Sequence, residues 1–139
     1  MLQFFFGNHT RFGFCCGKQF PGTHTLKGDL EALAVGAAHR LEQPWATVMP
    51  SIIDAAERNE DLAILQSQIH MQMRAPFVAV IERAQDRGEL TRSQDARELV
   101  ASIMGPLFYR RFFSRESLSE TFAKKVVGRA LRETTPTRS

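Results

Sequence analysis

The sequence predicts an all-α fold, a helical bundle of five or six helices. Three observations predict it: apolar residues recur at spacings of three and four from Thr25 onward, helix-stop signals separate these segments, and no segment alternates apolar and polar residues as a strand does. At 139 residues the chain is about one domain long. Its 43% of hydrophobic and 24% of charged residues are typical of a globular protein.

The first periodic segment follows an atypical start. Residues 1–24 are rich in Phe and Gly without either periodicity, so we expect a poorly specified tail or a collapsed cap there. Residues 26–43 place their apolar side chains on one narrow stripe, which predicts an amphipathic helix. Pro44 ends it.

Two more helices are expected before the middle of the chain. Thr47 is the expected N-cap of a short helix over residues 48–58, and Asn59 is expected to cap the next one. That next helix is long, with apolar residues recurring from Leu62 to Ala84 and a stop signal at Arg87-Gly88. Pro76 lies inside it, which predicts a kink or a break.

The segment from Ser93 to Arg115 is apolar on two adjacent stripes, with Ser93 as the expected N-cap and a bend expected at Pro106. The first stripe consists of Ala96, Leu99, Val100, Ile103 and Leu107. The second stripe consists of Ala101, Met104, Gly105, Phe108 and Phe112. A surface helix needs one such stripe, so the other requires a further partner, and a second copy of the chain is the simplest one.

The last helix is expected to begin with a capping box at Ser117 and Glu120. One of its faces carries Phe122, Val126 and Ala130, and an adjacent face carries Ala123, Val127 and Leu131. Both of the last two helices therefore have a wide apolar arc. Because the backbone can be approached most closely at Gly105, we assign the second stripe to the dimer interface. Residues 133–139 are expected to be a disordered tail.

Composition excludes several classes of function. The net charge of +3 comes from scattered Lys and Arg, which does not indicate nucleic-acid binding by this chain. Only two cysteines occur, a usage that fits the cytoplasm. No apolar run is long enough for a signal peptide or a membrane span, so no membrane partner is expected.

No catalytic pattern emerges, and an enzyme is not expected. The serines occur in no Gly-x-Ser-x-Gly elbow, and no Gly-rich loop follows a strand. The spacing of His9, Cys15, Cys16 and His24 matches no zinc-ligand pattern, so neither a metal nor a cofactor is expected.

Several soft or aromatic side chains have two interpretations. His70 flanks the apolar stripe of the long helix, either as a partly buried side chain with a local hydrogen bond or as a pocket residue that orients a ligand. The methionines and aromatic residues on several helices are either ordinary core or the deformable wall of an apolar pocket. The sequence does not separate these alternatives.

The ordered segments THTLKGDL, SIIDAAERNEDLA, MRAPFVAVIERAQDRGEL, SQDARELVASIMGPLFYRRFF and FAKKVV together resemble the C-terminal ligand-sensing and dimerisation domain of TetR-type transcriptional repressors. The resemblance covers about residues 22–132, and we take 25–132 as the regulatory domain. It implies that the last two helices pair with those of a second subunit as a four-helix bundle. It also implies a small, often apolar or aromatic effector between the preceding helices.

Carried over by position, the resemblance implies two sets of residues. Around the effector we expect Met49, Ile52, Ile53, Ile69, His70, Met73, Phe77, Met104 and Phe108. At the dimer interface we expect Ala101, Met104, Gly105, Phe108, Phe112, Phe122, Val126 and Ala130.

The family places a three-helix DNA-binding head before this domain, and residues 1–24 are too short to contain it. We therefore expect this chain not to bind an operator alone, because it is an incomplete or rearranged reading frame or a regulatory half that pairs with full-length relatives. The alternative function is a helical protein–protein interaction module that pairs with another regulator.

Overall fold

A computed structural model describes residues 25–134, and this part of the chain is all-α, as predicted. It contains five α-helices and two short helical turns: α2 (Leu26–Leu41), the 3-10 turn η2 (Pro44–Val48), α3 (Met49–Ala56), α4 (Glu60–Asp86), α5 (Ala96–Phe108), the π-helical turn η3 (Tyr109–Phe113) and α6 (Glu120–Thr134). The predicted cap 1–24 and most of the predicted tail lie outside the described residues.

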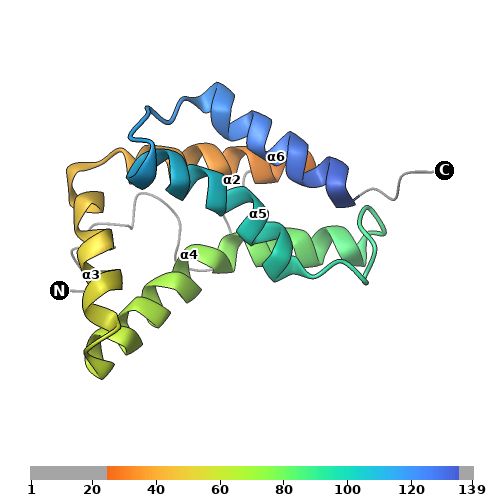
Figure 1. Ribbon diagram of the computed structural model, residues 1–139. Coiled ribbons are helices and arrows are strands. Elements are labelled where there is room, and N and C mark those ends of the chain that lie inside the picture. The colour runs from red at the N-terminus through yellow and green to blue at the C-terminus, as the bar shows by residue number, and fades with distance from the viewer. Residues whose placement is uncertain (1–24, 135–139) are drawn as a thin grey trace, which may run out of the picture.

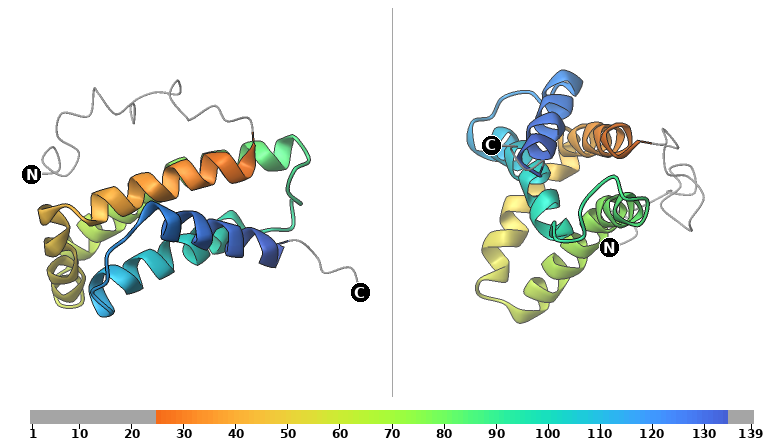
Figure 2. Two further views of the ribbon diagram at one scale, coloured as in Figure 1. Left: turned by 90° about the horizontal axis from the view of Figure 1, so that it is seen from above. Right: turned by 90° about the vertical axis from the view of Figure 1, so that its right-hand side faces the viewer.

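Helices α2, α4, α5 and α6 pack around one core, while α3 stands at one end against α4 (Figures 1 and 2). The core is built from the inward stripes of these four helices. Its most deeply buried residues include Leu30, Ala34, Phe77, Val80, Ile81, Leu99, Ile103, Leu107 and Val127.

Alanines line the contact between α2 and α6. Ala34, Ala37 and Ala38 on α2 are buried, as are Ala123 and Ala130 on α6. Small side chains let two helix backbones approach closely. The narrow apolar stripe of α2 is therefore enough to hold α6 in place.

The predicted helix ends are partly wrong. The Asn59 side chain accepts a hydrogen bond from the Leu62 N–H at 3.1 Å, which confirms this cap. Thr47, however, lies inside η2 and donates to the Pro44 carbonyl, so it does not cap the expected helix over 48–58, which the structure has as α3 over Met49–Ala56.

Two other caps are displaced by two residues. Asp95, not Ser93, caps α5, since its Oδ1 accepts from the Arg97 N–H at 2.8 Å. Ser119, not Ser117, accepts from the Phe122 N–H at 3.1 Å. Several polar residues that could cap a helix precede each of these two helices. The position at which the chain leaves the preceding packed segment determines which of them becomes the cap.

Both prolines inside helices change the local backbone. Helix α4 is continuous through Pro76, and Figure 1 shows its axis changing direction partway, so Pro76 produces a kink and not a break. It ends at Asp86, and Gly88 follows with a φ of 80°, as the predicted stop signal requires. After Pro106, α5 ends at Phe108 and continues as the turn η3.

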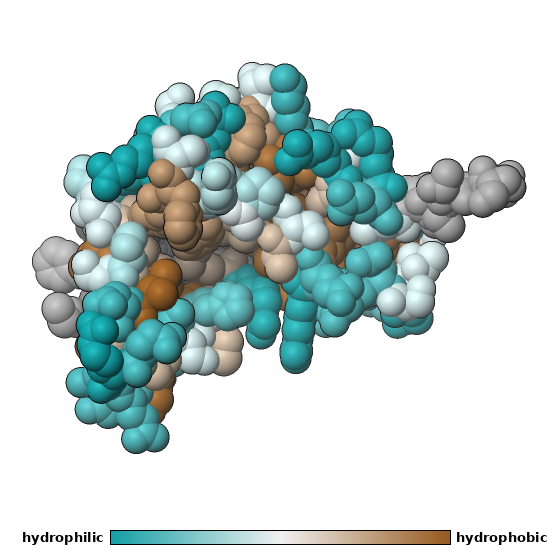
Figure 3. Space-filling model, viewed as in Figure 1, coloured by the Kyte–Doolittle hydropathy of each residue, from teal (hydrophilic) through white to brown (hydrophobic). Residues whose placement is uncertain are grey.

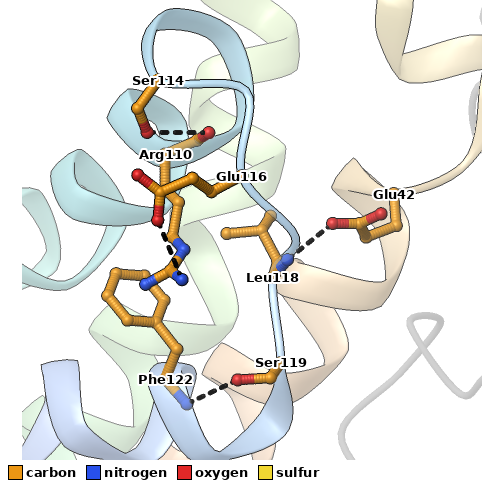
Figure 4. A network of polar contacts seen from close by, with 7 residues as sticks. All are labelled: Glu42, Arg110, Ser114, Glu116, Leu118, Ser119 and Phe122. Carbon is orange, nitrogen blue, oxygen red and sulfur yellow. Dashed lines mark hydrogen bonds and ion pairs between the residues drawn. The ribbon is translucent and has the colours of Figure 1, made fainter.

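The C-terminal end of α2 is bound to the connection between α5 and α6. Arg111 Nε donates to the Leu41 carbonyl at 2.7 Å, and the Leu118 N–H donates to Glu42 Oε1 at 2.7 Å, the second bond being visible in Figure 4. A cation at a helix C-terminus also interacts favourably with the helix dipole. These bonds hold α5 and α6 in a fixed position on α2.

The α4 core offers a matched pair of substitutions. Ile81 is fully buried and Ile64 is 52% exposed on the same helix. We expect Ile81→Ala to lower the free energy of unfolding by about 2–5 kcal/mol, because it leaves a cavity. Ile64→Ala should change it by less than about 1 kcal/mol in urea denaturation at equal protein concentration. Equal losses in both variants would contradict this core.

The Arg111 bond gives a second test. We expect Arg111→Met to lower the free energy of unfolding by about 1–2 kcal/mol, because a part-buried carbonyl loses its charged donor. The control is Arg115→Met in the neighbouring exposed segment, where we expect a change within about 0.5 kcal/mol. If thermal unfolding of the two variants coincides, the bond does not stabilise the fold.

Candidate functional site

A cavity of about 270 Å³ lies between α3, the first half of α4 and α5. It is lined by Met49, Ile53, Gln66, His70, Met73, Arg74, Arg97, Val100, Ala101, Met104 and Phe108. In Figure 3, apolar surface gathers between α3 and α5 with polar side chains around it. The volume is just below the ~300–1,000 Å³ of pockets for drug-sized molecules.

Helical periodicity explains the lining. Helix α3 contributes two residues four apart, and the α4 and α5 residues recur at three and four along one side of each helix. The α5 residues of the lining include members of its second stripe, Ala101, Met104 and Phe108, while Leu99, Ile103 and Leu107 of the first stripe are buried in the core. Thus α5 separates the core from the cavity.

The structure brings six of the nine expected effector residues to the cavity: Met49, Ile53, His70, Met73, Met104 and Phe108. The other three do not line it. Ile69 and Phe77 are 2% and 0% exposed and serve as interior packing, and Ile52 is half-buried outside the lining. For Ile69 and Phe77, interior packing accounts for the sequence pattern.

Sequence reasoning missed the polar members of the lining. Gln66 and Arg74 lie one turn on either side of His70, and Arg97 lies one turn before Ala101. The helical periodicity that predicts the apolar lining also predicts these polar residues. The signal for them is their spacing, not their hydrophobicity. Val100 was assigned to the core stripe, and it also borders the cavity.

All ionisable groups of the lining are basic. His70 and Arg97 are exposed and Arg74 is half-buried, so they form the solvent side of the cavity. No Asp or Glu belongs to the lining. Outside the cavity, burial lowers the pKa of the Arg40 guanidinium on α2.

A second depression, of about 550 Å³, lies on the outer side of α5 and α6. It is lined by Gly105, Pro106, Tyr109, Arg110, Ser114, Glu116, Phe122 and Arg129, and we call this surface the α5–α6 face. Beside it, Tyr109 and Phe113 stack with ring centroids 5.7 Å apart, and they are 63% and 78% exposed.

Arg110 organises this face (Figure 4). Its guanidinium lies 4.2 Å from the Phe122 ring centroid, and its Nη2 lies 3.0 Å from Glu116 Oε2. A backbone hydrogen bond joins the same two residues, since the Glu116 N–H donates to the Arg110 carbonyl at 3.0 Å. Arg110 Nε is buried without a hydrogen-bond partner among the described residues.

The expected interface residues differ in exposure within one chain. Ala101 and Gly105 are exposed, and Met104, Phe108, Phe112 and Phe122 are half-buried. Val126 and Ala130 are only 2% and 4% exposed, because they pack in the chain's own core, so their side chains leave almost no surface for a partner. The second stripe of α5 is thus incompletely covered by its own chain.

Residues 25–134 contain neither a metal-binding cluster nor a helix suited to span a membrane. No group of three or more His, Cys, Asp or Glu side chains there is arranged to hold a metal ion, and the cluster from His9 to His24 lies outside this range. None of the described helices is long and apolar enough to cross a membrane.

Comparison with known proteins agrees with this architecture. Residues 20–130 match the family model described as tetracyclin repressor-like, C-terminal domain. A Bacillus subtilis (strain 168) protein, named uncharacterized HTH-type transcriptional regulator YdeS, is 24% identical over 113 residues. The match covers 81% of this chain and 57% of that relative, so the chain spans little more than half of the relative's length. Because the family model matches most of the chain, the protein belongs to the tetracyclin repressor-like, C-terminal domain family.

Proposed function

We propose that residues 25–132 act as the effector-sensing and dimerisation domain of a TetR-type transcriptional regulator. The observation that carries this proposal is the double use of α5. Ala101, Met104 and Phe108 line the cavity, and they also belong to the stripe that its own chain leaves incompletely covered. A molecule that displaces this wall therefore acts directly on the helix that meets a partner.

The α5–α6 face supports homodimerisation. A Cβ built on Gly105 meets no atom within 4 Å, so the protomer leaves the space outside this backbone open. Exposed aromatic side chains, Tyr109 and Phe113, lie next to it. Aromatic residues around a closely approachable backbone are typical of the buried centre of an interface.

Binding to DNA would require a further domain. The described residues form the helical body alone. The Bacillus relative is named an HTH-type regulator, where HTH stands for helix-turn-helix, and the match covers 57% of its length. We propose that a change in the pairing of α5 and α6 alters the spacing of DNA-binding heads carried by the two subunits of a regulator. The effector then controls transcription through the dimer.

Gly105→Arg tests the dimer face. Since the protomer has room for a side chain at position 105, we expect the variant to fold normally and to weaken dimerisation by about 100-fold or more, because two symmetry-related cations meet at the interface. Sedimentation equilibrium measures this.

The matched control is Ala32→Arg on the exposed side of α2, which should remain dimeric. An unchanged dimer in Gly105→Arg would assign the interface to another face. A wild-type chain that stays monomeric at high micromolar concentration, but co-purifies with a different regulator, would favour the heterologous interaction module.

Two methionines on α4 test the sensing cavity. Met73 lines the cavity, whereas Met71 is 55% exposed outside the lining. We expect 2-naphthol, a neutral aromatic probe, to bind once per chain in calorimetric titration. Met73→Trp should weaken this binding by about tenfold or more, since the indole occupies the cavity.

Met71→Trp is the control and should bind the probe as the wild type does. If both tryptophan variants bind equally well, the probe does not occupy this cavity. If the wild type binds no probe, the sensing part of the proposal fails, whatever the oligomeric state.

A further inference from the structure

The charged groups of the cavity are all of one sign, and no acidic partner among residues 25–134 neutralises its two arginines. Among residues 25–134, neither Arg74 nor Arg97 takes part in an ion pair with a carboxylate. Asp95, the nearest acid before Arg97 in the chain, uses Oδ1 to cap the backbone of α5. Within the described part of the chain, the cavity therefore presents two guanidinium groups without a carboxylate partner.

These two arginines lie toward one end of the cavity. Helix α4 leads away from α3, and α5 leads back toward it (Figure 1). Arg74 is the last α4 residue of the lining and Arg97 is the first α5 residue of the lining. Both therefore come at the end of the lining that is remote from α3, with His70 one turn before Arg74.

The opposite end is largely apolar. Met49 and Ile53 of α3 and Met104 and Phe108 of α5 meet there, with Gln66 as a neutral polar side chain. The lining is thus polarised along its length, apolar at the α3 end and cationic at the other. A ligand that matches it has an apolar body and one anionic group.

We propose that the cavity binds a small organic anion, with its anionic group held between Arg74 and Arg97 and its apolar body against Met49, Ile53, Met104 and Phe108. This inference rests on the proposed sensing function and specifies its effector class. Guanidinium groups bind carboxylates and similar anions in bidentate geometry. The volume of about 270 Å³ restricts the body to a short alkyl chain or a compact ring.

Three unbranched probes with eight carbons each test the charge preference: octanoate, octan-1-ol and octylammonium. In calorimetric titration of the full chain at fixed ionic strength, we expect octanoate to bind about tenfold or more tightly than octan-1-ol. Octylammonium should bind more weakly than the alcohol, because its charge meets two arginines.

Substitution of the arginines tests the assignment. We expect Arg74→Met with Arg97→Met to reduce octanoate affinity by about tenfold or more, while octan-1-ol affinity stays within about twofold. Retained alcohol binding also shows that the variant is folded and its cavity intact. Arg132→Met, the same change in an exposed residue of α6 outside the cavity, should alter neither affinity.

The outcomes separate this inference from the proposed function. Equal binding of octanoate and octan-1-ol, or an octanoate affinity unaffected by the double substitution, would overturn the anion site and leave a neutral sensing cavity. Tightest binding of octylammonium would overturn it as well. If 2-naphthol binds but none of the octyl probes does, only the anion inference fails; if no probe binds, both the inference and the sensing function fail.

Discussion

The arrangement of this domain depends on one helix that is apolar over two adjacent faces. The first stripe of α5 supplies Leu99, Ile103 and Leu107 to the core, where each is nearly or fully buried. Its second stripe forms one wall of a cavity and borders the α5–α6 face. Because a helix moves as a unit over this length, a displacement of the cavity wall also displaces the α5–α6 face. We infer that the wide apolar arc connects sensing with pairing in this way.

Two parts of the structure are held differently. Alanine contacts and the bonds at Leu41 and Glu42 bind α6 and the end of α5 to α2. Helix α3 packs mainly on α4 and η2, and its buried Met49, like Ile69 of α4, lies outside the main core cluster. Pro76 stands between the halves of α4: Phe77, Val80, Ile81 and Ala84 after it belong to the core, whereas the cavity residues of α4 precede it. The kink therefore joins a firmly packed half to the half that lines the cavity.

The basic residues of the two surfaces are used differently. Arg110 and Arg111 are engaged, the first by Glu116 and the Phe122 ring and the second by the Leu41 carbonyl, so their charges are balanced by local structure. Arg74 and Arg97 face a largely apolar cavity without an acid in its lining. An unpaired cation beside apolar surface favours an anion from solution. This contrast is the physical basis for assigning an effector class to the cavity.

The sequence by itself determined the fold class, the stop at Gly88, the cap at Asn59, the kinking residue of α4 and the two stripes of α5, because helical periodicity and proline and glycine chemistry are local properties. It also indicated six residues that now line the cavity. Only the tertiary structure showed that Ile69, Phe77, Val126 and Ala130 lie in the interior. An apolar residue gives the same sequence pattern in a core, a pocket or an interface. It also chose among clustered capping residues and brought Arg74 and Arg97 to one end of a cavity, because both depend on how distant helices cross.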